Sequence, residues 1–512
     1  MDSNALHFCL LHFQGVYMSE RIEELEPEDA LAAAQRVSET VKNADNYDEL
    51  ASAIAHRYAM RSDFNRAVEI ADTINDPFAM EESIAAIAVM LSAVGREADA
   101  FELVESLEDF SHQATATSRI AVAHAVNGDF DRAIEVASGM DDNASTLVDI
   151  AYQFADKGQY ERALEITEDL DFPLGSVWVR TRIAQDYSKA GRTEEALQVL
   201  SQALEQAEEI DPPNEKAGTD SEIALRFFEL GVVERSREIL AQALADAKSS
   251  DKIYRDAALA QAAAGHARLK LYDSAVSIAE AIDSVYMAAS TLIDLALIEH
   301  EDESRRADAL QLLSDAFDLI VEEVPETQRD EAQRHHLLAR IALVNANFGL
   351  VDRALRAAKS IGEPDERAQV VSSVAVRLAE VSKYDEVRTA LQELDDESHM
   401  ANALVKISQV ANAAGIHDEG TEFLVEATKL VEKIEHPVDR VHTLMELAGT
   451  FKTCEDAKQL ASMFTQALSD TKLITSEFQK VAALLSIADA CAKTKYEMDE
   501  ESKELLWEIV VV

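Results

Sequence analysis

The sequence predicts an all-α chain built as a solenoid of stacked antiparallel helix hairpins. Two observations support this prediction. Gly (15 residues) and Pro (8 residues) are scarce among the 512 residues, whereas the strong helix formers Ala, Leu and Glu are abundant. A short pattern of residues also recurs about every 30–40 positions along nearly the whole chain. Such repetition is typical of helix hairpins, because one hairpin buries its apolar face only against a neighbouring copy.

The pattern is clearest in RIAVAHAVNGDFDRAIEVA, residues 119–137. Ile120 and Ala121 form an apolar dyad, Gly128 follows seven residues after Ala121, and Ala133 follows five residues after Gly128. Two antiparallel helices approach closely only where their facing side chains are small, so the two alanines mark the expected helix contact. Gly128 can adopt the left-handed conformation that ends a helix. We therefore expect a helix, a tight turn and a second helix.

The same spacing recurs in register along the chain, and it weakens only at Ala262-Ala263, where both positions are small. The other dyads are Ile54-Ala55, Ile87-Ala88, Ile120-Ala121, Ile150-Ala151, Ile183-Ala184, Ile223-Ala224, Leu295-Ala296, Ile341-Ala342, Val374-Ala375, Ile407-Ser408, Leu447-Ala448 and Ile487-Ala488. The turn position holds Ser62, Gly95, Gly128, Gly158, Gly191, Gly231, Gly349, Ser382 and Gly415. We expect longer second helices near residues 194–209, 304–321 and 418–433, because the steps there approach 40 residues.

The chain ends differ from the repeats. Residues 1–17 contain one acid and no Lys or Arg, so we interpret them as an over-extended or disordered start, with an apolar docking peptide as the alternative. Residues 18–46 are expected to form an N-terminal helical cap, residues 47–324 a first repeat array, and residues 325–492 a second array. The second array either continues the first or bends away at Val324-Pro325, since Pro interrupts a helix. Residues 493–512 are expected to form a C-terminal capping helix.

The order large apolar residue, Ala, aromatic, Gly, aromatic, Ala at these spacings resembles the tetratricopeptide repeat, in degenerate form, over about residues 47–492. Phe154 and Tyr187 occupy the aromatic position after the dyad, and Phe130 and Tyr160 occupy the one after the turn. The early Trp that is usual in this family is absent. The resemblance implies a right-handed superhelix whose first helices line a concave groove.

By the same resemblance, the groove positions lie three residues before and one residue after the alanine of each dyad. The residues at these positions include no Lys or Arg and are mostly small or apolar, so a cationic clamp for an acidic C-terminus is not expected. We expect a protein or peptide partner instead, bound as an extended peptide or amphipathic helix. The alternative is that these residues mainly pack one hairpin against the next. The candidate partner-binding residues are Val148, Tyr152, Thr181, Gln185, Ser221, Leu225, Ile293, Leu297, Leu343 and Val376.

The charge of the chain excludes some partners. With 97 acidic and 47 basic residues the net charge is -50, and the acid is spread along the whole sequence. A surface of this kind disfavours nucleic acid and anionic membranes. It resembles that of proteins from salt-accumulating halophiles, the alternative being an acidic scaffold of an ordinary cytoplasm. Three distant Cys residues indicate a reducing, cytoplasmic location. No apolar run approaches the ~20 residues of a membrane span.

No motif carries recognisable chemistry. His335 and His336 are adjacent and therefore point about 100° apart on a helix, which makes a poor metal site. Cys454 and Cys491 are interpreted as core residues. We therefore expect no catalytic residue, metal or cofactor, and predict a non-catalytic interaction scaffold that is monomeric or weakly dimeric through its C-terminal end. The alternatives are a regulatory sensor of a small molecule or signalling peptide, an enzyme whose site forms only in three dimensions, and an RNA binder, which would need Arg and aromatic residues along the groove.

Overall fold

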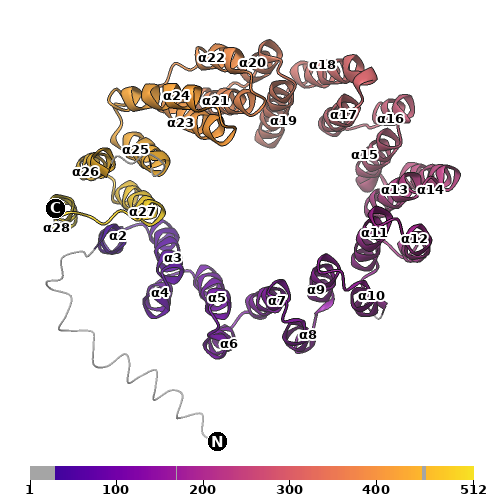
Figure 1. Cartoon of the computed structure of the whole chain (residues 1–512), viewed down its shortest axis with the longest axis horizontal. Helices are drawn as coiled ribbons and strands as arrows, with labels where there is room; N and C mark the ends of the chain where they lie inside the picture. Colours follow the sequence, from indigo (N-terminus) through magenta and orange to yellow (C-terminus); the bar gives the residue numbers. More distant parts are fainter. Residues whose placement is uncertain (1–28, 169, 452–456, 512) are drawn as a thin grey trace, which may run out of the picture. The chain divides into compact units, whose positions relative to one another are not determined.

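The computed structural model describes residues 29–168, 170–451 and 457–511. Within these ranges the chain forms 27 α-helices and one 3-10 helix, and no strand (Figure 1). The prediction of an all-α chain of stacked helix hairpins is confirmed. The predicted disordered start at 1–17, most of the first half of the predicted cap at 18–46, and residues Cys9 and Cys454 lie outside the described residues.

The chain divides into two compact units. The central unit is Ala88–Gly420, and the terminal unit combines Met1–Ile87 with Thr421–Val512. The divisions fall inside two helices, α5 (Pro77–Ala93) and α24 (His417–Val431).

The central unit has two layers of helices (Figure 1). The first helices from Phe110–Val126 to Pro364–Glu380 each pack against their own second helix and against the first helix of the following hairpin. The first helices are α7 (Phe110–Val126), α9 (Ala144–Asp156), α11 (Pro173–Lys189), α13 (Pro213–Glu229), α15 (Lys252–Arg268), α17 (Val285–His300), α19 (Gln328–Asn347), α21 (Pro364–Glu380) and α23 (Glu397–Ala413). The second layer holds α6 (Glu97–Ser106), α8 (Phe130–Ser138), α10 (Tyr160–Glu168), α12 (Thr193–Ala207), α14 (Val233–Ser249), α16 (Tyr272–Ala279), α18 (Arg306–Glu322), α20 (Val351–Lys359) and α22 (Tyr384–Leu391).

The hairpin of α7 and α8 shows why the recurring residues are needed. Gly128 has a φ of 87°, and its N–H donates to the carbonyl of Ala125 at 2.9 Å. The N–H of the next residue, Asp129, donates to the carbonyl of His124 at 2.9 Å, so the last carbonyls of α7 are satisfied by the turn itself. The Asp129 side chain then caps the start of α8. Ala121 and Ala133 are fully buried at the contact between the two helices.

The dyads are buried throughout, and the predicted turn residues share one backbone conformation. All residues of the thirteen dyads, including Ala262-Ala263, are at most 2% exposed. All nine predicted turn residues have positive φ, between 61° and 87°. The hairpin with the weakest pattern keeps the same turn, because Lys270 takes a φ of 61° at the equivalent position. A lysine pays a steric penalty for this conformation that glycine does not, so packing of the helices imposes the turn there.

The unequal repeat lengths arise in the second helices. Several of them, such as α8 and α20, have 9 residues. The three predicted to be long, α12, α18 and α24, have 15, 17 and 15 residues. Val324-Pro325 lies between α18 and α19, inside the central unit, and α19 packs against both α17 and α18. A capping box between Thr327 and Asp330 begins α19 directly after this proline.

The terminal unit packs helices from the first part of the sequence against helices from its last part. Its helices are α2 (Ala30–Ser38), α3 (Ala44–Met60), α4 (Phe64–Ala71), α25 (Pro437–Phe451), α26 (Ala457–Leu473), α27 (Glu477–Thr494) and α28 (Glu500–Val511). The small helix α2 packs against α3, α27 and α28. Arg57 of α3 binds Asp489 of α27 with two hydrogen bonds of 2.8 and 2.7 Å. Leu506 and Ile509 of α28 are buried, and α28 packs on α26 and α2, whereas Trp507 is 37% exposed.

Candidate partner-binding site

The ten candidate residues all lie on first helices of the central unit, and they fall into two groups. Val148 of α9, Ser221 of α13 and Ile293 of α17 are at most 3% exposed. The other seven are half-buried: Tyr152 of α9, Thr181 and Gln185 of α11, Leu225 of α13, Leu297 of α17, Leu343 of α19 and Val376 of α21.

The buried group fills the contacts between neighbouring first helices. A Cβ atom on Gly175 of α11 would lie 2.5 Å from the Cγ2 atom of Val148, so the glycine allows this close approach. The Ser221 hydroxyl lies within 2.7 Å of the Ala217 carbonyl and 3.4 Å of the Gln261 carbonyl of α15. These side chains hold one hairpin against the next.

The half-buried group presents side-chain surface beside these contacts. Tyr152 and Leu225 are partly buried and pack against the hydrophobic core of the central unit. Burial raises the pKa of the Tyr152 hydroxyl to about 12, so this side chain is neutral at physiological pH. The half-buried residues are therefore the members of the predicted set that a partner can reach.

Leu343 and Val376 come together in a pocket between α19, α21 and α23, which we call the α21 pocket. Its volume is about 490 Å³. Leu343, Val376 and Ala403 supply apolar surface, and Ala403 is nearly fully buried. The remaining lining residues are polar or charged: Gln369, Ser372, Ser373, Arg377, Glu380, His399, Asn402 and Lys406.

The polar groups of the α21 pocket differ in how they are satisfied. The hydroxyls of Ser372 and Ser373 donate within their own helix, to the carbonyls of Ala368 and Gln369 at 2.9 Å. By contrast, the Oδ1 atom of Asn402 is buried without a hydrogen-bond donor. Lys406 is exposed and makes no ion pair with any residue that the structure describes. Asn402 and Lys406 therefore retain hydrogen-bonding capacity for a ligand.

The charged rim of the α21 pocket is partly neutralised internally. Arg377 and Glu380 form an ion pair of 2.5 Å one turn apart on α21. The Nδ1 atom of His399 lies 2.9 Å from Oδ1 of Asp396. Burial raises the pKa of Asp396, but hydrogen bonds from the His399 N–H and ring outweigh that effect, so its pKa lies below the usual range.

The α21 pocket is more polar than the small-residue apolar groove expected from sequence. Arg377 and Lys406 each stand one residue after a groove position, and Asn402 stands three residues before one. Side chains of this length reach over the neighbouring positions of a helix, because each covers the surface of the preceding turn. Counting positions from each dyad therefore identified Leu343 and Val376 as lining residues, but it did not identify Arg377, Asn402 or Lys406.

His335 and Cys491, which the sequence raised as candidates for chemistry, are buried and half-buried respectively. His335 is buried and its Nδ1 lies 2.7 Å from Oε2 of Glu366, while His336 is exposed, so the two rings face different surroundings. Burial raises the pKa of the Cys491 thiol to about 12, which suppresses the nucleophilic thiolate. Among residues 29–168, 170–451 and 457–511, no group of three or more His, Cys, Asp or Glu side chains is arranged to hold a metal ion.

A buried and a half-buried ionisable group lie next to each other at the end of α17. Glu299 is fully buried, burial raises its pKa, and its carboxylate accepts a 3.1 Å hydrogen bond from Arg305. Burial lowers the pKa of His300, whose ring stacks on Phe348 with 3.4 Å between centroids. Each group is thus engaged by a neighbour that fixes the end of this hairpin.

None of the helices in the described part of the chain has both the length and the apolarity of a membrane span.

No protein-family model matches the chain, and no curated protein matches it in sequence. Solved structures of other helical proteins align with it at low TM-scores. Ton1535 from Thermococcus onnurineus NA1 is 21% identical, with 69% of this chain and 97% of the other covered, at a TM-score of 0.25. The human IFIT1 dimer with m7Gppp-AAAA is 11% identical, with 80% and 96% covered, at 0.26. Naa15/Naa10 bound to HypK-THB is 14% identical, with 99% of each chain covered, at 0.26. Scores this low carry neither a family nor a function to this chain.

Proposed function

We propose that this protein is a non-catalytic, cytoplasmic interaction scaffold of the tetratricopeptide type that binds a peptide segment of a partner protein in the α21 pocket. The observation that carries the proposal is the convergence of Leu343 and Val376, groove positions of two successive hairpins, on one pocket of about 490 Å³. Apolar surface beside hydrogen-bonding groups is what an extended peptide needs for one anchoring side chain and its backbone.

The polar groups of the α21 pocket suggest which peptide fits. The Asn402 carbonyl has no donor in the structure, and a peptide N–H would satisfy it. Lys406 has a free ammonium group at the rim, which would bind an acidic side chain next to the apolar anchor. The ligand class is therefore an extended segment with one apolar residue adjacent to Asp or Glu. The net charge of -50 favours such a local cation contact over binding of nucleic acid.

A selection experiment tests the proposal. A peptide library displayed on phage is selected with the full chain, and enriched peptides are measured by fluorescence anisotropy. Val376→Gln should weaken binding about tenfold or more, because it places an amide on the apolar surface of the pocket. Val122→Gln is the matched control: it is the same change at the equivalent position of α7, outside the α21 pocket. Val122→Gln should change the affinity by less than about twofold.

A second variant checks the partner chemistry. Lys406→Glu should abolish binding of enriched peptides that carry an acidic residue, and should spare those that carry a basic one. Enriched peptides that bind Val376→Gln and Val122→Gln equally well would show that the α21 pocket is not the binding site.

A small-molecule sensor is the second candidate function, and the size of the α21 pocket favours it. A volume of about 490 Å³ lies within the ~300–1,000 Å³ range of ligand pockets. A thermal-shift screen of metabolites against the wild type and Val376→Gln separates the candidates. A metabolite that raises the melting temperature of the wild type alone would support the sensor, and failure of every metabolite to do so would exclude it.

A further inference from the structure

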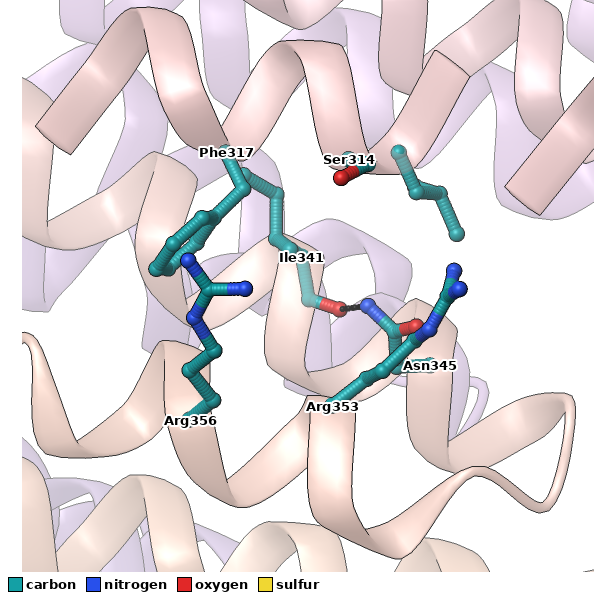
Figure 2. Close-up of a pocket in the computed structure, with 7 residues that line it drawn as sticks. Ser314, Phe317, Ile341, Asn345, Arg353 and Arg356 are labelled. Atoms are coloured by element: carbon teal, nitrogen blue, oxygen red, sulfur yellow. Dashed lines mark hydrogen bonds between the residues drawn. The ribbon is translucent and has the colours of Figure 1, made fainter. Parts of the chain in front are cut away.

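A second, smaller pocket lies between α18, α19 and α20 in the central unit, and it shares no residue with the α21 pocket. Its volume is about 90 Å³. Figure 2 shows the side chains of Arg353 and Arg356 rising from α20 towards α18, with Asn345 of α19 between them. The other lining residues are Leu313, Ser314 and Phe317 of α18 and Ile341 of α19.

The two arginines give this pocket a positive charge within a strongly acidic protein. They stand three residues apart on α20, a spacing at which like charges repel. The Arg353 guanidinium donates to the Leu310 carbonyl at 3.0 Å, and the Arg356 guanidinium lies 4.5 Å from the centre of the Phe317 ring. The nearest carboxylate that the structure pairs with either arginine is Asp318, 3.9 Å from Arg356. Both of these side chains are more than half exposed, so this ion pair is weak.

Asn345 points independently to a ligand. It is 3% exposed, and its Nδ2 atom donates to the Ile341 carbonyl at 2.8 Å, which fixes the orientation of the amide. Its Oδ1 atom is then left buried without any hydrogen-bond donor. Buried acceptors in this state are rare in folded proteins, and a bound group with a donor removes the penalty.

The apolar side chains that line this pocket strengthen the polar contacts made inside it. Leu313, Phe317 and Ile341 are buried apolar side chains, and charges interact more strongly beside such a surface than in water. The Ser314 hydroxyl adds a group that can donate to an oxygen atom. The pocket thus combines two cations, one hydroxyl and one acceptor around a small volume.

We propose that this pocket binds a small tetrahedral oxyanion that carries a proton, namely hydrogen phosphate. The Arg353 and Arg356 guanidiniums neutralise the charge, Ser314 donates to one oxygen, and Asn345 Oδ1 accepts the hydrogen bond of the P–OH group. Sulfate has the same shape and no proton at neutral pH, so it would leave Asn345 unsatisfied. The site does not depend on peptide binding in the α21 pocket.

Isothermal titration calorimetry with the full chain, in about 0.15 M NaCl to screen distant charges, tests the proposal. Inorganic phosphate should bind, and sulfate should bind about tenfold more weakly, because the unsatisfied acceptor disfavours it. Arg353→Gln and Arg356→Gln should each weaken phosphate about tenfold or more. Arg237→Gln, an exposed arginine of α14 outside this pocket, is the matched control and should leave the affinity unchanged.

Asn345→Ala isolates the role of the amide. It should weaken phosphate binding, because the P–OH contact is lost, and it should not weaken sulfate binding, because sulfate has no proton to donate to the amide oxygen. Circular dichroism of each variant confirms that the helices are retained. Equal affinities of the wild type for phosphate and sulfate, or phosphate binding unaffected by both arginine variants, would overturn the assignment, as would the absence of heat at about 10 mM phosphate.

A phosphate monoester separates the free ion from an ester as the source of the group. The second pKa of a monoester is about 6, so glycerol 3-phosphate loses its last proton as the pH rises through about 6. Its affinity should fall on going from about pH 5.5 to about pH 8 more than that of inorganic phosphate, which keeps a proton. A monoester that binds more tightly than inorganic phosphate at the higher pH would contradict recognition of the P–OH group.

Discussion

Replacing Gly265 with alanine tests how closely first helices must approach. Gly265 lies inside α15, and a Cβ atom there would be 2.5 Å from Ser221 Oγ, 2.7 Å from Ser221 Cβ and 3.0 Å from Leu240 Cδ2. The Ser221 hydroxyl can rotate, although it then loses its 2.7 Å hydrogen bond to Ala217. The Cβ of Ser221 moves only with its helix, so α13 and α15 must separate.

The size of the effect follows from two opposing contributions. Alanine is favoured over glycine inside a helix by about 1 kcal/mol, whereas overpacking a tight contact costs about 1–3 kcal/mol. Gly218 of α13 is a matched control at the same interface, because a Cβ there would lie 3.5 Å from Gln261, an ordinary van der Waals distance. Gly218→Ala keeps the gain in helix propensity without the clash. The two variants should therefore differ in stability by about 1–3 kcal/mol.

Native-state amide hydrogen exchange of α13 and α15 is the suitable assay, because hairpins of a solenoid can open separately. Gly218→Ala should raise the free energy of opening and Gly265→Ala should lower it relative to Gly218→Ala. Adding Ser221→Gly to Gly265→Ala should recover part of the loss, although Ser221→Gly alone destabilises α13. If Gly265→Ala protects α15 as well as Gly218→Ala does, the close packing inferred here is wrong.

Three further predictions concern electrostatics. The Asp48 carboxylate accepts hydrogen bonds from the N–H groups of Asn75 and Asp76 at 2.8 and 2.9 Å; burial raises its pKa, but these bonds outweigh burial and hold the pKa below the usual 3.8. The stability that the Asp48 carboxylate contributes is present above about pH 4 and is lost as pH falls through the lowered folded-state pKa. Asp48→Asn should therefore lower the free energy of unfolding by about 1–3 kcal/mol at neutral pH and by less in acid, as measured by urea unfolding. An equal loss at both pH values would refute this. Asp470→Asn should destabilise the terminal unit by about 3 kcal/mol, because Arg440 binds Asp470 at 2.5 and 2.7 Å in a largely buried pair; unchanged exchange protection of α25 and α26 would exclude it. Thermal melting in KCl from about 0.1 to 2 M should show rising stability, since salt screens the net charge of -50; a constant melting temperature would contradict this.

The sequence alone determined the hairpin and its repetition. Ala121 and Ala133 could be assigned to the helix contact because only small residues permit close approach, and both are fully buried. Gly128 could be assigned to the turn because its backbone requirement is local. The lengths of α12, α18 and α24 also followed from spacing, since each extra turn of helix adds residues between dyads.

Sequence spacing also placed the ten candidate residues on first helices, but it could not separate the buried ones from those that a partner can reach. The buried ones are Val148, Ser221 and Ile293, whereas Leu343 and Val376 line a pocket. That distinction depends on the rotation and stagger of neighbouring helices, which small residues such as Gly175 and Gly265 set by permitting closer approach. A one-dimensional pattern carries the period of a helix and not the position of its neighbour.

Only the tertiary structure decided which polar groups meet. Asn402 and Lys406 reach the α21 pocket beside side chains from two other helices. Asn345 and Arg353 come from different helices that close around the smaller pocket. An unsatisfied Oδ1 atom exists only once the surrounding helices have excluded water from it, because the same amide in an unfolded chain is fully hydrated.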